Sequence, residues 1–235
     1  MRQKYYQMNI NEESKEADIY IYGDITSWEW DESDVSSFTL SKDLQALPDD
    51  IQIINVYINS YGGEVAEGLA ICSALKRHKA KVKTFCDGFA ASIASVIFSA
   101  GDERIMSNSS LLFIHNAWSY ASGDSAAMAK AAEDLEKITQ ASIEAYKSVV
   151  TISEEELKEL MNKESWLSPS ECLEMGFATS IVNDDSSKNP SQSVKKEMQK
   201  VLLNSNALVG QSNPKLKEPE QEPAKNMMLE ILKNL

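Results

Sequence analysis

Residues 51–64, IQIINVYINSYGGE, and residues 82–99, VKTFCDGFAASIASVIFS, decide the fold class of this chain. The first half of each stretch is rich in β-branched and aromatic residues, which favour strands. A glycine turn follows in both, and then apolar or small residues recur at helical spacing, over 64–78 and 92–99. This repeated order of strand, turn and helix predicts an α/β fold.

The alternation extends outward from these two stretches. We predict further strands at 19–22, 104–106 and 111–115, and a long helix over about 124–150. The predicted core-facing residues of the long helix are Met128, Leu135, Ile138 and Tyr146. Serines followed three residues later by glutamate, at 153–156 and 168–171, have capping-box spacing and predict two more helices.

Composition divides the chain into a folded part and a tail. The 235 residues are 43% hydrophobic and 25% charged, which suits a globular core. Four of the six prolines lie beyond residue 182, in a stretch of Asn, Ser, Gln, Lys and Glu. We therefore expect a flexible segment at 1–17, one folded domain at 18–182 and a largely disordered tail at 183–235.

The charge balance excludes one large class of partner. Acids outnumber bases by 36 to 23, for a net charge of −13, whereas a non-specific nucleic-acid binder needs a basic face. The apolar run at 88–101 is too short to cross a membrane, and the N-terminus lacks the pattern of a secretory signal. Three cysteines without a CxxC pair indicate reduced thiols, so we expect a cytoplasmic protein.

Histidine 115 is a candidate general base. It ends an apolar strand pattern, a place where a rigid scaffold can present an imidazole to a cleft. A buried structural histidine is the alternative for such a residue. The other histidine, His78, lies among lysine and arginine at the end of a predicted helix, where cations complement the helix dipole.

Serine 92 is a candidate nucleophile. It would lie in the first turn of the helix at 92–99, where free backbone N–H groups stabilise negative charge on a reacting oxygen. The alternative is that the small residues around it only permit tight packing. Similarly, the turn at Gly62-Gly63 can supply an oxyanion-hole donor or be a plain strand–helix connection.

Together these segments resemble the proteolytic subunit of the Clp protease, and more closely its shortened phage and prophage relatives, the head-maturation proteases. The resemblance runs through about residues 18–182. It rests on four motifs in the family's order: Tyr57-Ile58-Asn59-Ser60-x-Gly62-Gly63, Gly88-x-Ala90-Ala91-Ser92 leading to Ser99-Ala100-Gly101, Ile114-His115-Asn116, and Trp166-Leu167-Ser168-x-x-Glu171-x-x-x-x-Gly176.

The resemblance implies a crotonase-like fold of repeated ββα units and a serine endopeptidase with a Ser–His–acid triad. Ser92 would be the nucleophile, His115 the general base, and the N–H groups of Gly63 and Ile93 the oxyanion hole. The triad acid would be Glu164, at a position where the family usually has aspartate. A solvated acid at a helix end is the alternative for this residue.

The resemblance also implies the surroundings of the site. Substrate would be bound by Gly62, Gly63, Glu64 and Asn116, with no metal and no cofactor. The helix at 124–150 would join subunits of a ring, heptameric and stacked in two layers. The segment before residue 19 lacks the usual axial-loop sequence, so we do not expect dependence on an ATP-driven (AAA+) unfoldase.

The phage relatives suggest a role in phage head maturation, with capsid or scaffold proteins as substrates, in the host cytoplasm. Two alternatives belong to other classes. One is a crotonase-type acyl-CoA hydratase or isomerase, which uses paired carboxylates on the same fold. The other is a ring-forming assembly protein whose site has decayed, against which the presence of both Ser92 and His115 counts.

Overall fold

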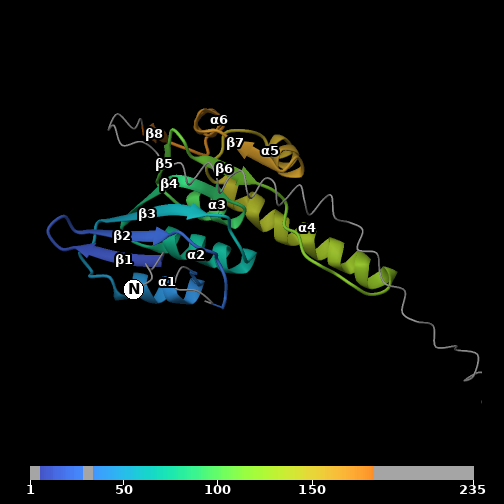
Figure 1. Cartoon of the computed structure of the whole chain (residues 1–235), viewed down its shortest axis with the longest axis horizontal. Coiled ribbons are helices and arrows are strands. Elements are labelled where there is room, and N and C mark those ends of the chain that lie inside the picture. Colours follow the sequence, from blue (N-terminus) through green and yellow to red (C-terminus); the bar gives the residue numbers. More distant parts are fainter. Residues whose placement is uncertain (1–5, 29–33, 183–235) are drawn as a thin grey trace, which may run out of the picture. The chain divides into compact units, whose positions relative to one another are not determined.

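Figure 1 shows the computed structural model, which describes residues 6–28 and 34–182. The chain divides into two units, Met1–Asp185 and Ser186–Leu235, and all described residues lie in the first. The tail expected at 183–235 lies outside the described residues.

Eight strands and six helices form the described part. The strands are β1 (Tyr6–Asn11), β2 (Glu16–Ile21), β3 (Ile53–Ser60), β4 (Lys81–Ala91), β5 (Glu103–Ser107), β6 (Leu111–Ile114), β7 (Ser165–Leu167) and β8 (Ser180–Val182). The helices are α1 (Ser37–Ala46), α2 (Val65–Arg77), α3 (Ile93–Phe98), α4 (Ser125–Lys147), α5 (Glu154–Asn162) and α6 (Pro169–Glu174). This order confirms the predicted α/β class.

One largely parallel sheet organises these elements. Its main order is β1-β2-β3-β4-β5-β8, with β1 antiparallel to β2 and the other neighbours parallel. The first part of β4 pairs with β5, and its last residues, Phe89–Ala91, pair with β6. Strand β6 in turn pairs antiparallel with β7. Strand β4 therefore belongs both to the main sheet and to the smaller group of β6 and β7, and it ends where β6 diverges from β5.

The helices cover one face of the sheet, and this face forms the core. Along β2, Ala17, Ile19 and Ile21 are buried while the residues between them are partly exposed, as expected for a strand with one covered face. Helix α2 packs between α1 and α3 and buries Ile71 and Leu75. The helix predicted at 64–78 is thus confirmed within one residue at each end.

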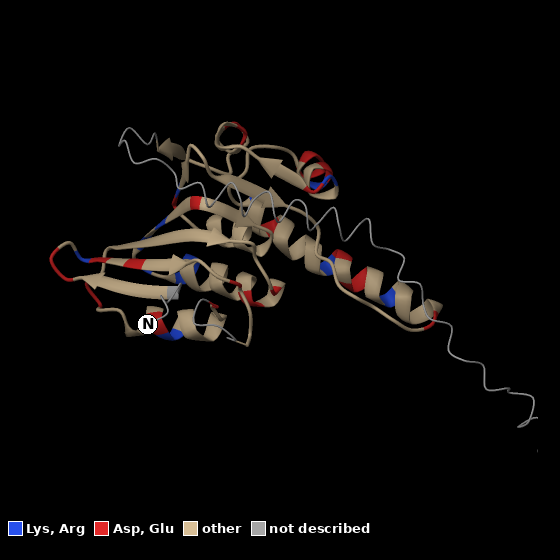
Figure 2. Cartoon of the chain, viewed as in Figure 1, with Lys and Arg blue, Asp and Glu red and all other residues tan. Residues whose placement is uncertain are grey.

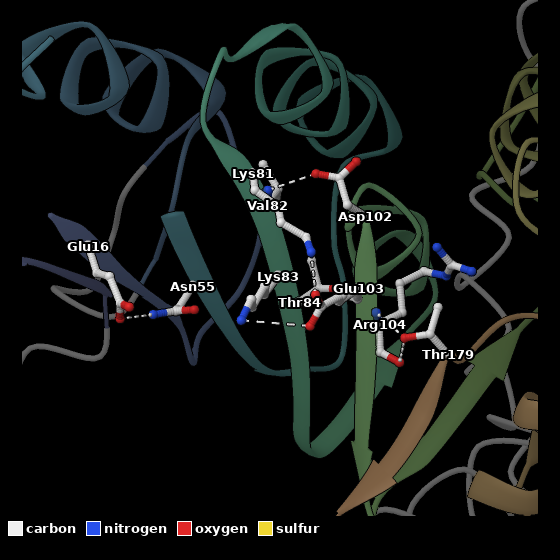
Figure 3. A network of polar contacts seen from close by, with 10 residues as sticks. All are labelled: Glu16, Asn55, Lys81, Val82, Lys83, Thr84, Asp102, Glu103, Arg104 and Thr179. Atoms are coloured by element: carbon white, nitrogen blue, oxygen red, sulfur yellow. Dashed lines mark hydrogen bonds and ion pairs between the residues drawn. The ribbon is translucent and has the colours of Figure 1, made fainter. Parts of the chain in front are cut away.

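The opposite face of the sheet is aromatic and polar. Tyr20, Tyr57 and Phe85 occupy the same register on three adjacent strands, and their rings stack with 4.8 Å between neighbouring centroids. Figure 3 shows the polar part of this face, where the Asn55 amide donates to Glu16 and the Lys83 ammonium lies 3.7 Å from Glu103.

Of the four core-facing residues predicted for α4, only Tyr146 is buried, so the prediction is wrong for the other three. Tyr146 and Ile143 are buried, but Met128 and Ile138 are 43% and 40% exposed, and Leu135 is only half-buried. The first half of α4 extends past the sheet, so no described element covers it (Figure 1). Charges of both signs lie along this half (Figure 2) and form pairs within the helix, Lys130 with Asp134 and Lys137 with Glu133.

The sequence analysis missed two elements near the N-terminus. Residues 6–11, expected to be flexible, form β1, which completes the sheet by pairing with β2. Ser36 caps helix α1, since its hydroxyl accepts from the Thr39 N–H. The helix buries only Leu40 and Leu44. Two buried residues in ten give too weak a periodicity for the helix to be predicted.

The two helix starts predicted from capping-box spacing are confirmed. The Ser168 hydroxyl accepts from the Glu171 N–H, and the Glu171 carboxylate accepts from the Ser168 N–H, which confirms a full capping box. Ser153 caps α5 by accepting from the Glu156 N–H. Each cap fixes the start of the helix that the sequence predicted there.

Arginine 104 holds the C-terminal part of the fold to the sheet. Its guanidinium donates to the carbonyl oxygens of Phe177, Gly101 and Gly176 over 2.8 to 3.1 Å. Its backbone also exchanges hydrogen bonds with Thr179 (Figure 3). One planar side chain thus joins the end of α3 to the loop after α6.

We predict that Arg104→Lys destabilises the fold. Lysine keeps the charge but cannot donate in three fixed directions, so the loss should be about 2 kcal/mol, which lowers Tm by roughly 5 °C. Thermal unfolding at equal protein concentration measures the change. Arg77→Lys, at an exposed helix end, is the control and should leave Tm unchanged; equal Tm values for both variants would contradict the assigned role of Arg104.

Candidate active site

Serine 92 lies at the junction between β4 and α3. Its backbone has φ 54° and ψ −128°, in the left-handed half of conformational space that residues other than glycine rarely occupy. Hydrogen bonds hold this conformation on both sides: the Ser92 N–H donates to the Phe113 carbonyl over 2.9 Å, and the Ser92 carbonyl accepts from the Ser95 N–H over 3.0 Å. Such strain persists where the surrounding structure determines it, often at functional sites.

Histidine 115 lies beside this serine. It follows β6 directly, and its Nε2 lies 2.7 Å from the Ser92 Oγ. The register of β4 against β6, with Ala91 opposite Phe113, brings together two side chains that are 23 residues apart. The Phe113 ring packs against the imidazole, with 5.2 Å between centroids and 25° between planes.

The surroundings of His115 favour a neutral imidazole. Burial lowers its pKa below the usual 6.5 because the charged form loses hydration, while the Glu164 carboxylate opposes this by raising the pKa. The net shift is downward. A neutral imidazole at neutral pH can accept a proton from the adjacent serine hydroxyl.

Glutamate 164 lies near His115 but makes no hydrogen bond to it in the described part of the chain. Strand β7 pairs with β6 so that Ser165 is opposite Ile114, and one residue further this register places Glu164 opposite His115. Glu164 has φ 51°, so it shares with Ser92 a left-handed backbone, and its side chain is exposed. The strand register therefore places the predicted acid near the histidine, and the two side chains interact only through the charge of the carboxylate.

The turn at 62–63 accepts only glycine. Gly62 has φ +101°, and a Cβ there would lie 2.8 Å from both the Ser92 Cβ and the Ala91 carbonyl oxygen. Gly63 has φ +146°, and a Cβ there would lie 2.0 Å from the Ile25 carbonyl oxygen. The missing side chains let this turn approach the serine closely.

Two N–H groups near the serine are candidates for an oxyanion hole. Ile93 is the first residue of α3, where N–H groups lack intrahelical acceptors. In the turn, the Gly62 N–H donates to the Ser60 Oγ and the Glu64 N–H donates to the Ile25 carbonyl. Among the described residues, no acceptor is found for the N–H of Gly63 or of Ile93.

The other predicted binding residues make contacts with nearby loops. The Glu64 carboxylate accepts from the Thr26 hydroxyl and from both the N–H and the hydroxyl of Ser27, and these bonds lower its pKa. The Asn116 amide donates to the Asn162 side chain over 2.7 Å. Glu64 therefore holds the loop at 26–27, and Asn116 contacts the end of α5, both at the edge of the site.

A cleft of about 550 Å³ runs past the serine and histidine. It is lined by Asp24, Ile25, Thr26, Tyr61, Gly62, Gly63, Glu64, Val65, Ser92, His115, Ala117 and Trp118. The sequence analysis did not identify Asp24 and Trp118, which come from irregular segments without a motif, or Tyr61, which is the unspecified position of the motif at 57–63. Burial and the nearby Asp34 carboxylate raise the pKa of Asp24, whose carboxylate adds to the acidic lining.

The described residues, 6–28 and 34–182, contain neither a group of side chains suited to a metal ion nor a helix suited to a membrane. No group of three or more His, Cys, Asp or Glu side chains there is arranged to hold a metal ion. No helix in the same residues is long and apolar enough to span a membrane. Cys72, Cys86 and Cys172 are buried free thiols.

Two comparisons with known proteins point to one family. The model of the Clp protease family matches residues 7–185, which is most of the chain. The ATP-dependent Clp protease proteolytic subunit of Deinococcus radiodurans is 31% identical over 134 residues. That alignment covers 56% of this chain and 66% of the relative, so the chain spans just under two thirds of the relative's length.

The matched residues include the whole sheet except the first residue of β1, and all six helices. The observed sheet with its covering helices is consistent with the fold expected from the resemblance. On these grounds, the chain belongs to the Clp protease family.

Proposed function

We propose that this protein is a serine endopeptidase. The observation that carries the proposal is the 2.7 Å contact between the His115 Nε2 and the Ser92 Oγ, in a cleft that both residues line together with Gly63. A serine hydroxyl becomes a nucleophile when a neutral base within hydrogen-bonding distance takes its proton. Membership of the Clp protease family supports this chemistry.

The proposed reaction follows from the positions of the groups. Ser92 Oγ attacks the peptide carbonyl while its proton passes to the His115 Nε2, and the N–H groups of Gly63 and Ile93 stabilise the oxyanion. His115 then protonates the leaving amine, and a water molecule, activated by the same imidazole, hydrolyses the acyl-enzyme. Glu164 stabilises the imidazolium that forms in both steps, because its negative charge favours the protonated ring.

The acyl-CoA alternative fits the site less well. It requires carboxylates free to move protons beside the oxyanion hole. The Glu64 carboxylate instead holds Thr26 and Ser27. Covalent labelling of Ser92 by a fluorophosphonate would distinguish the peptidase from both the hydratase and a decayed assembly protein.

We further propose a homo-oligomeric ring, heptameric and stacked in two layers, with α4 at the contact between layers. The exposed apolar side chains Met128 and Ile138 and the alanines at 126, 127, 129, 131 and 132 support an interface there. Capsid or scaffold proteins of a phage are the proposed substrates, cleaved in the host cytoplasm. For substrate recognition we propose Gly62, Gly63, Glu64 and Asn116.

The first prediction from the proposed function is that Ser92→Ala abolishes peptide hydrolysis and leaves the fold and the assembly intact. The hydroxyl supplies the attacking oxygen and contributes little to packing, since the side chain is only half-buried. Hydrolysis of a fluorogenic peptide mixture and labelling by a fluorophosphonate measure the loss, with His115→Ala expected to lose a similar amount. Turnover by purified Ser92→Ala comparable to the wild type would refute the nucleophile.

The second prediction concerns pH. Hydrolysis should fail as pH falls through the pKa of His115, because only the neutral ring accepts a proton, and this acidic limit should lie below pH 6.5. Glu164→Gln removes the charge that raises this pKa, so the limit should move to still lower pH. Its rate should also fall more than about tenfold, since the imidazolium loses its counter-charge.

The control for this variant is Glu159→Gln, which removes an exposed carboxylate from the preceding helix. It should leave both the rate and the pH profile as in the wild type. If Glu164→Gln behaved like this control, Glu164 would not be the acid that supports His115.

The third prediction tests the interface. Ile138→Glu places a charge on the exposed half of α4 and should lower the mass measured by light scattering, because an apolar contact between subunits cannot bury an unpaired carboxylate. Phe38→Glu, which places the same charge on the exposed face of α1, is the control and should keep the wild-type mass. A monomeric wild-type protein, or an unchanged mass for Ile138→Glu, would contradict the proposed ring contact.

A further inference from the structure

Two hydroxyl groups are buried together beneath the candidate site. The Tyr146 OH, from α4, lies 2.6 Å from the Ser95 Oγ, from α3. Tyr146 is 2% exposed and Ser95 is fully buried. A buried hydroxyl is costly unless it is hydrogen-bonded, so the apolar core tolerates this pair only because each group satisfies the other.

A carbonyl oxygen decides which hydroxyl donates and which accepts in the contact between Tyr146 and Ser95. The Ser95 Oγ lies 2.5 Å from the Ser92 carbonyl oxygen, which can only accept, so Ser95 donates to it. The single Ser95 proton is then used, and Tyr146 must be the donor to Ser95. Burial raises the pKa of Tyr146, which keeps that proton in place at all physiological pH values.

The end of this chain of hydrogen bonds is the peptide unit that joins Ser92 to Ile93. A peptide unit is planar, and its carbonyl and its N–H point in opposite directions within one plane. Whatever fixes the Ser92 carbonyl therefore also fixes the direction of the Ile93 N–H. The strained φ of 54° at Ser92 makes such support necessary, because this conformation is unfavourable by itself.

We propose that Ser95 and Tyr146 are positioning residues that orient the Ser92–Ile93 peptide so that the Ile93 N–H points at the developing oxyanion. This inference rests on the proposed peptidase mechanism, to which it adds two residues that touch neither substrate nor the reacting atoms. Donors held in place before the reaction stabilise the transition state without reorganising, which is the main advantage of an oxyanion hole.

The chain contains a matched control for the Ser95 hydroxyl. Ser99 lies one turn further along, at the end of α3, is equally buried, and donates from its Oγ to the carbonyl three residues before it, that of Val96, over 2.7 Å. Ser95→Ala and Ser99→Ala thus remove the same kind of bond from the same helix. Only the first of these bonds ends on the peptide unit beside the proposed nucleophile.

The experiment measures the rate constant of covalent labelling by a fluorophosphonate, whose phosphoryl oxygen occupies the oxyanion position, in the full-length protein well below Tm. Ser95→Ala and Tyr146→Phe should each slow labelling about tenfold, less than the 10²–10³ for complete removal of an oxyanion donor. Ser99→Ala should label at the wild-type rate. For a fluorogenic peptide, the same two variants should lower kcat and leave KM unchanged.

Two further readouts separate positioning from a general loss of stability. The pH dependence of labelling should be unchanged in both variants, because the contact between Ser92 and His115 is untouched. The double variant Ser95→Ala/Tyr146→Phe should be no slower than Ser95→Ala alone, since Tyr146 acts only through Ser95. If Tyr146→Phe does not fold, the comparison of Ser95→Ala with Ser99→Ala decides the question by itself.

Wild-type labelling rates in Ser95→Ala, or equal losses in Ser95→Ala and Ser99→Ala, would overturn the inference and leave the proposed function standing. A wild-type protein that neither labels at Ser92 nor hydrolyses peptides would instead refute the proposed function, and the inference with it. Multiplied losses in the double variant would show that Tyr146 does not act through Ser95.

Discussion

The hydrogen bond from the Ser92 N–H to the Phe113 carbonyl is the interaction on which the site depends. It continues the pairing of β4 with β6 by one residue, past the point where the β4 chain leaves the sheet. The same bond holds Ser92 in a left-handed conformation and sets its distance from His115, which follows β6. A shift of this register by one residue would turn His115 to the other face of the sheet and separate it from the serine.

The rest of the fold supports this one junction. Strand β4 is held on both sides, by β3 along its length and by β5 and β6 in succession, so its end cannot move independently. Below it, the buried Ser95 and Tyr146 connect α3 to α4 through hydroxyl groups within an apolar core. Polar groups in such a position restrict how the two helices can pack, because any other arrangement leaves a hydroxyl unsatisfied.

The electrostatics of the site come from burial as much as from charge. His115 has a lowered pKa because the surrounding protein excludes water, and the Glu164 carboxylate reduces that shift without a hydrogen bond. The carboxylates of Asp24 and Glu64 border the same cleft, so the environment of the serine is acidic in a chain whose net charge is −13.

Local sequence patterns determined the α/β class, the strand–turn–helix segment around Gly63, and the caps of α5 and α6, because each depends on residues close together in the chain. The glycine turn predicted between residues 82 and 99 is wrong, since β4 runs through Gly88 to Ala91. The sequence also singled out Ser92, at the start of a predicted helix, and His115, at the end of a predicted strand. Tertiary structure alone decided the pairing of β4 with β6 that joins them, the exposure of Met128 and Ile138, and the contact of Tyr146 with Ser95 across 51 residues. Periodicity shows that one face of a helix is apolar, but whether that face is buried depends on which elements the sheet brings against it, and this is fixed only when the whole chain packs.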